Sequence, residues 1–175
     1  MGKKWVVAAG LAVTLMSTAG LASAAPPSFT PLENKVRHEL VMLPYLNVFD
    51  DISFRVDGNT VTLFGEVTKP VLRTDAENVV KRVEGVARVE NQIEVLPLSS
   101  FDDGIRLRTA RAIFGYPALQ RYGMGAQPSI HVIVKNGNVT LTGFVSTSMD
   151  KQLAFMRANA VPGVFAVNNQ LQLDK

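Results

Sequence analysis

Apolar and polar residues follow one pattern of alternation that occurs twice along the chain. Phe54-Arg55-Val56 and Val61-Thr62-Leu63 alternate with the period of a half-buried strand. Gly58-Asn59 lies between them, and both residues tolerate the positive φ of a tight turn, so a β-hairpin is predicted. In the second half, Asn136-Gly137 stands before Val139-Thr140-Leu141 in the same way.

Each hairpin is flanked by two amphipathic helices and followed by one strand. The helix before each hairpin is predicted from apolar stripes at Leu32, Val36, Leu40 and Leu43, and at Ile105, Thr109, Ile113 and Tyr116. The helix after it is predicted from Ala76, Val80 and Val83, and from Ala154, Ala158 and Val161. Pro44 and Pro117 end the first helices, and Gly85 and Gly163 close the second. The last strands are predicted through Val89, Asn91, Ile93 and Val95, and through Val167, Asn169, Leu171 and Leu173.

The two halves are an internal repeat. V-T-L-x-G-x-V occurs at residues 61–67 and 139–145, and G-V-x-x-V-x-N-Q occurs at residues 85–92 and 163–170, both at an offset of 78 residues. The sequence therefore predicts an α+β fold of two tandem αββαβ modules, each a three-stranded sheet covered on one face by two helices. Four glycines are interpreted as residues of special backbone geometry: Gly65, Gly85, Gly143 and Gly163.

The N-terminus has the pattern of a secretory signal peptide. Lys3 and Lys4 precede an apolar run over residues 6–16, and Ala22-Ser23-Ala24 is a cleavage pattern that favours a mature chain beginning at Ala25. An uncleaved anchor is the alternative, although the run is short for a membrane span. The predicted organisation is a signal peptide at 1–24, a linker at 25–31, a first domain at 32–96, a linker at 97–101 and a second domain at 102–175.

The αββαβ order, with V-T-L-x-G-x-V and then G-V-x-x-V-x-N, resembles the BON domain, named for bacterial osmotically inducible and nodulation proteins. The resemblance covers nearly all of the predicted mature chain, twice. Proteins with paired BON domains are typically periplasmic, and some are outer-membrane lipoproteins. The resemblance implies contact with phospholipid or envelope partners, a role in envelope integrity or osmotic stress, and no catalysis.

Composition narrows these expectations. The chain of 175 residues has no cysteine, which excludes disulfides, a thiol nucleophile and lipid attachment at an N-terminal cysteine. The formal charge of +3 falls to +1 when the two lysines of the leader are removed. Residues 31–100 carry eight Lys/Arg and eleven Asp/Glu, whereas residues 101–175 carry eight and four. The acidic first copy and the basic second copy are suited to different partners.

No pattern of catalytic or metal-binding residues occurs. The only histidines are His38 and His131, too few for an ordinary zinc site. The adjacent pairs Asp50-Asp51 and Asp102-Asp103 are interpreted as capping or solvated groups. No phosphate-binding glycine motif and no dense basic, aromatic patch is present. We therefore expect a non-enzymatic protein with no cofactor, no metal and no nucleic-acid partner.

Differences between the copies indicate candidate binding surfaces. Where the first copy has polar residues on the outer face of its first helix, the second has Leu107, Arg108, Arg111 and Phe114. An apolar strip edged by arginine suits anionic phospholipid or an envelope protein. A second candidate strip is Met149, Leu153 and Met156, for which packing between the modules is an equal alternative. A third is the sheet face with His131, Ile133, Thr140, Thr142 and Phe144, where the modules could instead meet.

Two functions follow from these surfaces. One is a periplasmic protein that binds phospholipid surfaces and supports envelope integrity. The other is a periplasmic protein-interaction or chaperone-like module that does not bind lipid directly. Salt-sensitive binding to anionic vesicles distinguishes the first from the second.

Overall fold

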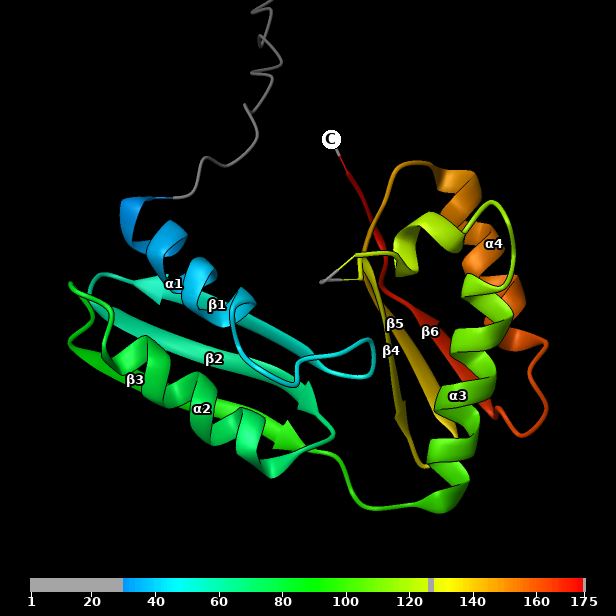
Figure 1. Ribbon diagram of the computed structural model, residues 1–175, viewed down its shortest axis with the longest axis horizontal. Helices are drawn as coiled ribbons and strands as arrows, with labels where there is room; N and C mark the ends of the chain where they lie inside the picture. The colour runs from blue at the N-terminus through cyan, green and yellow to red at the C-terminus, as the bar shows by residue number, and fades with distance from the viewer. Residues whose placement is uncertain (1–29, 126–127, 175) are drawn as a thin grey trace, which may run out of the picture.

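The computed structural model describes residues 30–125 and 128–174, so the predicted signal peptide lies outside the described residues. The first copy forms module 1, with α1 (Pro31–Val41), β1 (Asp51–Asp57), β2 (Thr60–Val67), α2 (Pro70–Lys81) and β3 (Arg88–Val95). The second copy forms module 2, with α3 (Ser100–Phe114), a 3₁₀ turn η1 (Gln120–Gly123), β4 (Ile130–Lys135), β5 (Asn138–Val145), α4 (Ser148–Asn159), β6 (Ala166–Asn169) and β7 (Gln172–Leu173). Two helices cover one face of each sheet, which confirms the predicted α+β fold (Figure 1).

Both sheets have a central strand that pairs antiparallel on one side and parallel on the other. In module 1 the order is β1-β2-β3, and in module 2 it is β4-β5-β6, with β7 also pairing with β5. The continuous last strand predicted for the second copy is wrong, because it is interrupted between β6 and β7. The Asn169 side-chain oxygen accepts a hydrogen bond from the Leu171 N–H at 3.3 Å, and the Gln170 N–H donates to the Leu141 carbonyl.

The predicted helix stripes face the two cores. Val36, Leu40 and Leu43 are buried in module 1, as are Ile105, Thr109 and Ile113 in module 2. The stripe after each hairpin is also buried, at Ala76, Val80 and Val83 and at Ala154, Ala158 and Val161. Tyr116 is exposed, so its assignment to the core is wrong: α3 ends at Phe114, and Leu119 and Tyr122 from the segment around η1 fill that part of the core instead.

The repeated glycines and turns have the backbone geometry that the sequence indicates. The turn Asn136-Gly137 has φ values of 52° and 76°, as a two-residue hairpin loop requires. Gly143 has a φ of 105°, and a Cβ there would overlap the Ser129 carbonyl. Gly65 is equivalent in module 1, where a Cβ would overlap the Asp51 carbonyl. Each of these glycines therefore lets the first strand of its hairpin pass close to the second.

The loop between α1 and β1 of module 1 reaches the edge of the module 2 sheet (Figure 1). The Val132 N–H in β4 donates to the Val48 carbonyl at 2.8 Å, and the Arg106 Nη2 donates to the Val134 carbonyl at 2.7 Å. These bonds satisfy polar groups on an edge strand that would otherwise be open to another chain. Lys135 at the end of β4 pairs with Glu94 of module 1 at 2.6 Å.

Candidate binding surface

The outer face of α3 presents three of its four predicted contact residues to solvent. Ile105, Thr109 and Ile113 point into the core, which turns Leu107 and Arg111 to the opposite side of the helix. Leu107 is 59% exposed, and Arg108 and Arg111 are exposed beside it. Leu107 therefore forms an apolar projection beside two cations.

Phe114, the fourth predicted contact residue, is half-buried. It packs against the core of module 2, and its ring lies so close to Gly123 that a Cβ there would be 2.6 Å from a ring carbon. The ring therefore holds η1 against the end of α3 and presents only one side to solvent. Its role in binding stays a prediction, and its substitution would also disturb the fold.

The second candidate strip lies on the outer side of α4. Met149 is 77% exposed and Met156 is 51% exposed, while Leu153 is half-buried against the module 2 core. Methionine side chains are flexible and adapt to irregular apolar surfaces. This strip therefore adds an exposed, deformable apolar surface to module 2.

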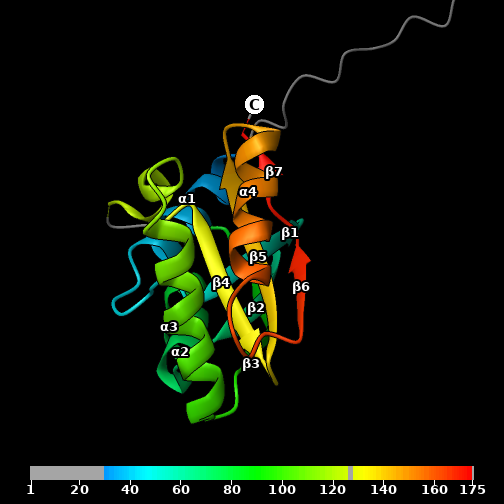
Figure 2. The same ribbon diagram turned by 90° about the vertical axis from the view of Figure 1, so that its right-hand side faces the viewer.

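The strips on α3 and α4 belong to one continuous face. The Arg157 Nε donates to the Ala112 carbonyl at 3.0 Å, and the Arg108 Nη2 donates to the Pro162 carbonyl at 3.3 Å. Ala112 and Arg157 both lie near the C-terminal ends of their helices. Arg108 lies earlier in α3, whereas Pro162 lies beyond the end of α4, so the two helices are adjacent and antiparallel. Figure 2 shows them together on the side of module 2 turned away from module 1. We call this surface, with Leu107, Arg108, Arg111, Met149, Met156 and Arg157, the outer helical face.

Charge on the outer helical face is predominantly positive. Among the described residues, Arg108, Arg111 and Arg157 have no ion-pair partner. Arg157 stacks instead over the Tyr116 ring, 5.3 Å from its centroid. The face therefore carries three cations whose charge is not neutralised by a described carboxylate, and this favours an anionic surface.

The carboxylates of the module 2 helices are already engaged. Asp102 accepts hydrogen bonds from the N–H groups of Asn136 and Gly137, which fixes the hairpin turn to the start of α3. Asp103 is paired with Arg106. Asp150 accepts from Arg121 and from the hydroxyl groups of Tyr122 and Thr147. Only Asp103 of these three is exposed, and its charge is already paired with Arg106.

Asp150 shows how strongly one of these carboxylates is held. Its burial opposes ionisation, but hydrogen bonds from Thr147, Tyr122 and Arg121 outweigh this effect and hold the pKa of Asp150 below its ordinary value. The charged form is therefore part of the folded module at neutral pH. Its role is to join η1 to the start of α4.

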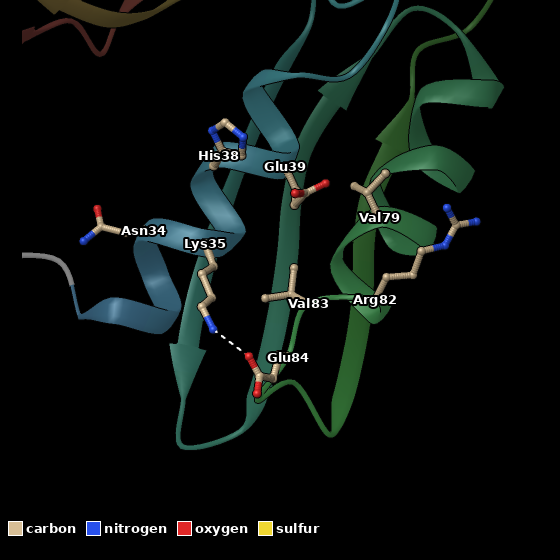
Figure 3. Close-up of a pocket in the computed structure, with 8 residues that line it drawn as sticks. All are labelled: Asn34, Lys35, His38, Glu39, Val79, Arg82, Val83 and Glu84. Atoms are coloured by element: carbon tan, nitrogen blue, oxygen red, sulfur yellow. Dashed lines mark hydrogen bonds and ion pairs between the residues drawn. The ribbon is translucent and has the colours of Figure 1, made fainter.

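The equivalent surface of module 1 has a different character. The groove between α1 and α2 is lined by Lys35, His38, Glu39, Arg82 and Glu84 over the apolar Val79 and Val83 (Figure 3). Lys35 and Glu84 pair across it at 3.0 Å. Because acidic and basic groups alternate there, this groove has no single charge that would select an anionic ligand.

The third candidate surface, the open sheet face of module 2, lies where the modules meet. Ile133 is only 3% exposed, and His131, Thr140 and Thr142 are partly buried. Glu66 lies on β2 of module 1. Burial and the charges of Asp51 and Glu94 raise the pKa of Glu66, although Lys135 of module 2 acts in the opposite direction. This sheet face is thus covered at Ile133, while Phe144 remains half-exposed.

Comparison of the copies had missed two aromatic residues that the structure brings together. Phe101 at the start of α3 and Phe165 after α4 have ring centroids 6.0 Å apart. Phe165 is 72% exposed, yet its equivalent in module 1 is Ala87. This replacement of a small residue by an aromatic one was the signal in the sequence that could have identified the position.

The described residues contain no group of side chains suited to metal binding. No group of three or more His, Asp or Glu side chains is placed to hold a metal ion in residues 30–125 and 128–174. Asp50, the buried carboxylate of module 1, accepts from the Thr68 N–H and hydroxyl and from the Asn47 N–H. It acts as a buried structural acceptor, so the prediction of a capping or solvated group is wrong for Asp50.

These features define a tandem α+β protein with a cationic, partly apolar helical face. The family model of the BON domain matches residues 30–97 and 118–175, and the chain therefore belongs to the BON domain family. The second match begins after α3, so the helix with the candidate contact residues lies outside the matched segment. BON domains are known in envelope and periplasmic proteins.

Solved structures and curated sequences add little to this assignment. The C-terminal domain of CdsD, the structural protein of the type III secretion system of Chlamydia trachomatis, is 12% identical over 85% of this chain and 100% of that chain, with a TM-score of 0.30. A second CdsD structure is 12% identical over 82% and 93%, with a TM-score of 0.29. Likeness at this level supports no inference about fold or function. No curated protein sequence matches the chain. Within the described residues, no helix has the length and apolar character needed to span a membrane.

Proposed function

We propose that this protein is a non-enzymatic periplasmic envelope protein that binds anionic phospholipid surfaces through the outer helical face of module 2. The single observation that carries the proposal is the exposure of Leu107, Met149 and Met156 among three arginines without ion-pair partners. Apolar side chains can enter the acyl boundary of a membrane while cations meet the phosphate groups.

The position of this face supports the proposal. Contacts between the modules use the loop with Val48, the edge of β4 and the pair formed by Lys135 and Glu94. No hydrogen bond or ion pair described between the modules involves α3 or α4. The outer helical face is therefore left available, which removes the main reason to interpret the methionine strip as packing between modules.

The expected affinity is low. Full burial of one Leu or Met side chain contributes about 1.5–3 kcal/mol, and each cation near an anionic surface contributes about 1 kcal/mol. Part of this gain is lost in immobilising the protein. Binding should therefore be reversible and should weaken as salt rises. Such behaviour suits a peripheral protein that supports envelope integrity, including under osmotic stress.

The test is co-sedimentation of the predicted mature chain with phosphatidylglycerol vesicles. Leu107→Asp places a charge on the apolar projection, so we expect it to lower binding by at least tenfold. Val41→Asp is the matched control, since Val41 is exposed on the outer side of α1. The control should bind like the wild type. Circular dichroism should show that both variants retain their fold.

Equal binding by Leu107→Asp and the wild type would remove α3 from the contact. The remaining function is then a protein-interaction or chaperone-like module, and capture of an envelope protein without lipid would support that alternative. Phe114→Asp is a poor test because Phe114 packs against the core. Loss of binding by this variant could result from loss of structure alone.

A further inference from the structure

The end of module 2 that carries the β4–β5 turn exposes large apolar side chains. Phe101 is 49% exposed, Phe165 is 72% exposed and Leu98, in the linker that leads into α3, is 98% exposed. We call Leu98, Phe101 and Phe165 the aromatic tip. Burial of so much apolar surface in a soluble partner or membrane is favourable, whereas its exposure to water is not.

The rings of the aromatic tip are held in place by glycines. The Phe165 ring lies over Gly137 of the hairpin turn, where a Cβ would be 2.5 Å from a ring carbon. The Phe101 ring lies beside Gly163, at 3.6 Å from the position of a Cβ. Because Gly137 and Gly163 have no side chains, the rings pack directly on the backbone of two turns and lose little freedom on docking.

The charges around the aromatic tip are compatible with an anionic surface. Arg108 lies against the same turn, with its Nη2 3.3 Å from the Pro162 carbonyl. Two exposed carboxylates at this end are paired with cations: Asp103 with Arg106, and Glu94 with Lys135. Arg108 is therefore a cation beside exposed aromatic rings. The third carboxylate at this end, Asp102, is buried and accepts hydrogen bonds from the N–H groups of Asn136 and Gly137.

We propose that the aromatic tip is the part of module 2 that penetrates an anionic phospholipid bilayer. This inference rests on the proposed function and adds the element that inserts and the orientation of the module. Phe101 is separated from Arg108 by about 10 Å along the α3 axis, at a rise of about 1.5 Å per residue. The tip enters the acyl boundary while Arg108 and Arg111 meet the headgroups, with α3 inclined to the membrane surface.

The chain offers a clean spectroscopic test. Its one tryptophan is Trp5, in the predicted signal peptide, so the predicted mature chain of residues 25–175 has none. This chain contains every described helix and strand. Phe165→Trp, Leu107→Trp and Phe64→Trp each introduce one fluorophore, at the tip, on the middle of the outer helical face and on the sheet of module 1. The probe is a vesicle of phosphatidylglycerol and phosphatidylcholine in equal parts, with phosphatidylcholine brominated on its acyl chains.

We expect the emission of Phe165→Trp to shift to shorter wavelength and to lose at least half of its intensity to the brominated chains. Leu107→Trp should be quenched less, and Phe64→Trp should not change. If Leu107→Trp is quenched and Phe165→Trp is not, the tip does not insert, although the proposed function stands. If no variant is quenched and the wild-type chain does not sediment with these vesicles, the proposed function itself fails.

A substitution test is independent of fluorescence. Phe165→Ala introduces the residue that module 1 has at the equivalent position, Ala87, and should lower vesicle affinity roughly tenfold. Phe64→Ala is the control, because Phe64 is an exposed aromatic residue on module 1. Unchanged affinity of Phe165→Ala, with its fold intact, would overturn the inference.

Discussion

Charge reversal at Arg111 tests the electrostatic part of the proposed contact. Arg111 is exposed on α3, and its side chain has no ion-pair partner among the described residues. Arg111→Glu therefore changes the surface charge by two units without breaking a described side-chain contact. One cation near an anionic surface contributes about 1 kcal/mol, so the reversal should cost about 2 kcal/mol at low salt. This corresponds to a loss of affinity of roughly 30-fold.

The assay is vesicle binding over a range of salt concentrations, with Arg73→Glu as the matched control. Arg73 is exposed on α2, so Arg73→Glu gives the protein the same net charge as Arg111→Glu but places the change on module 1. The difference between Arg111→Glu and the wild type should shrink as salt rises, because the screening length falls to about 8 Å at physiological ionic strength. Equal losses for the two variants would mean that net charge, and not the outer helical face, determines binding.

Three further predictions concern the fold, the module interface and export. Gly143→Ala should lower the free energy of unfolding by about 3 kcal/mol or more in a thermal melt, because its Cβ would overlap the Ser129 carbonyl at a φ of 105°. Gly104→Ala, inside α3, is the control and should leave the melting temperature nearly unchanged; equal melting of the two variants would refute the close approach of strands at Gly143. Burial and the nearby carboxylates raise the pKa of Glu66 in the folded protein, so the stability of the protein falls as pH rises through that pKa. Glu66→Gln should therefore stabilise the protein at neutral pH by less than about 1 kcal/mol, and the gain should be absent below pH of about 4. N-terminal sequencing of the exported protein should begin at Ala25, and retention of the first 24 residues would contradict this.

The fold could be predicted because each copy confirmed the interpretation of the other. The glycines of the repeat, such as Gly65 and Gly143, recur at one offset and have positive φ in both modules. The same logic failed at Tyr116, where periodicity was continued past the end of α3. The extra residues of the second copy form η1, and Leu119 from this segment enters the core in place of Tyr116.

The binding surface could be predicted only in part. Comparison of the copies identified Leu107, which is exposed, but it could not show that Phe114 packs over Gly123. It also could not pair Phe101 with Phe165, since the two are distant in sequence and meet only after α3 and α4 pack side by side. Periodicity describes one helix at a time, whereas this surface depends on two helices and a turn.

The arrangement of the modules had no signal in the sequence. Its described contacts include a hydrogen bond from the Val132 N–H to the Val48 carbonyl, and backbone groups are the same in every residue. The ion pair between Lys135 and Glu94 joins a residue of the basic second copy to one of the acidic first copy. Many other pairs would have satisfied that asymmetry equally well.

The central claim is that module 2 binds anionic membranes through its outer helical face. The most direct measurement is flotation of the predicted mature chain with phosphatidylglycerol vesicles and, separately, with phosphatidylcholine vesicles, at low and at high salt. We expect the protein to float with phosphatidylglycerol at low salt, to be released at high salt, and to stay unbound with phosphatidylcholine. Failure to float with phosphatidylglycerol at low salt, or equal flotation with both lipids at every salt concentration, would contradict the claim.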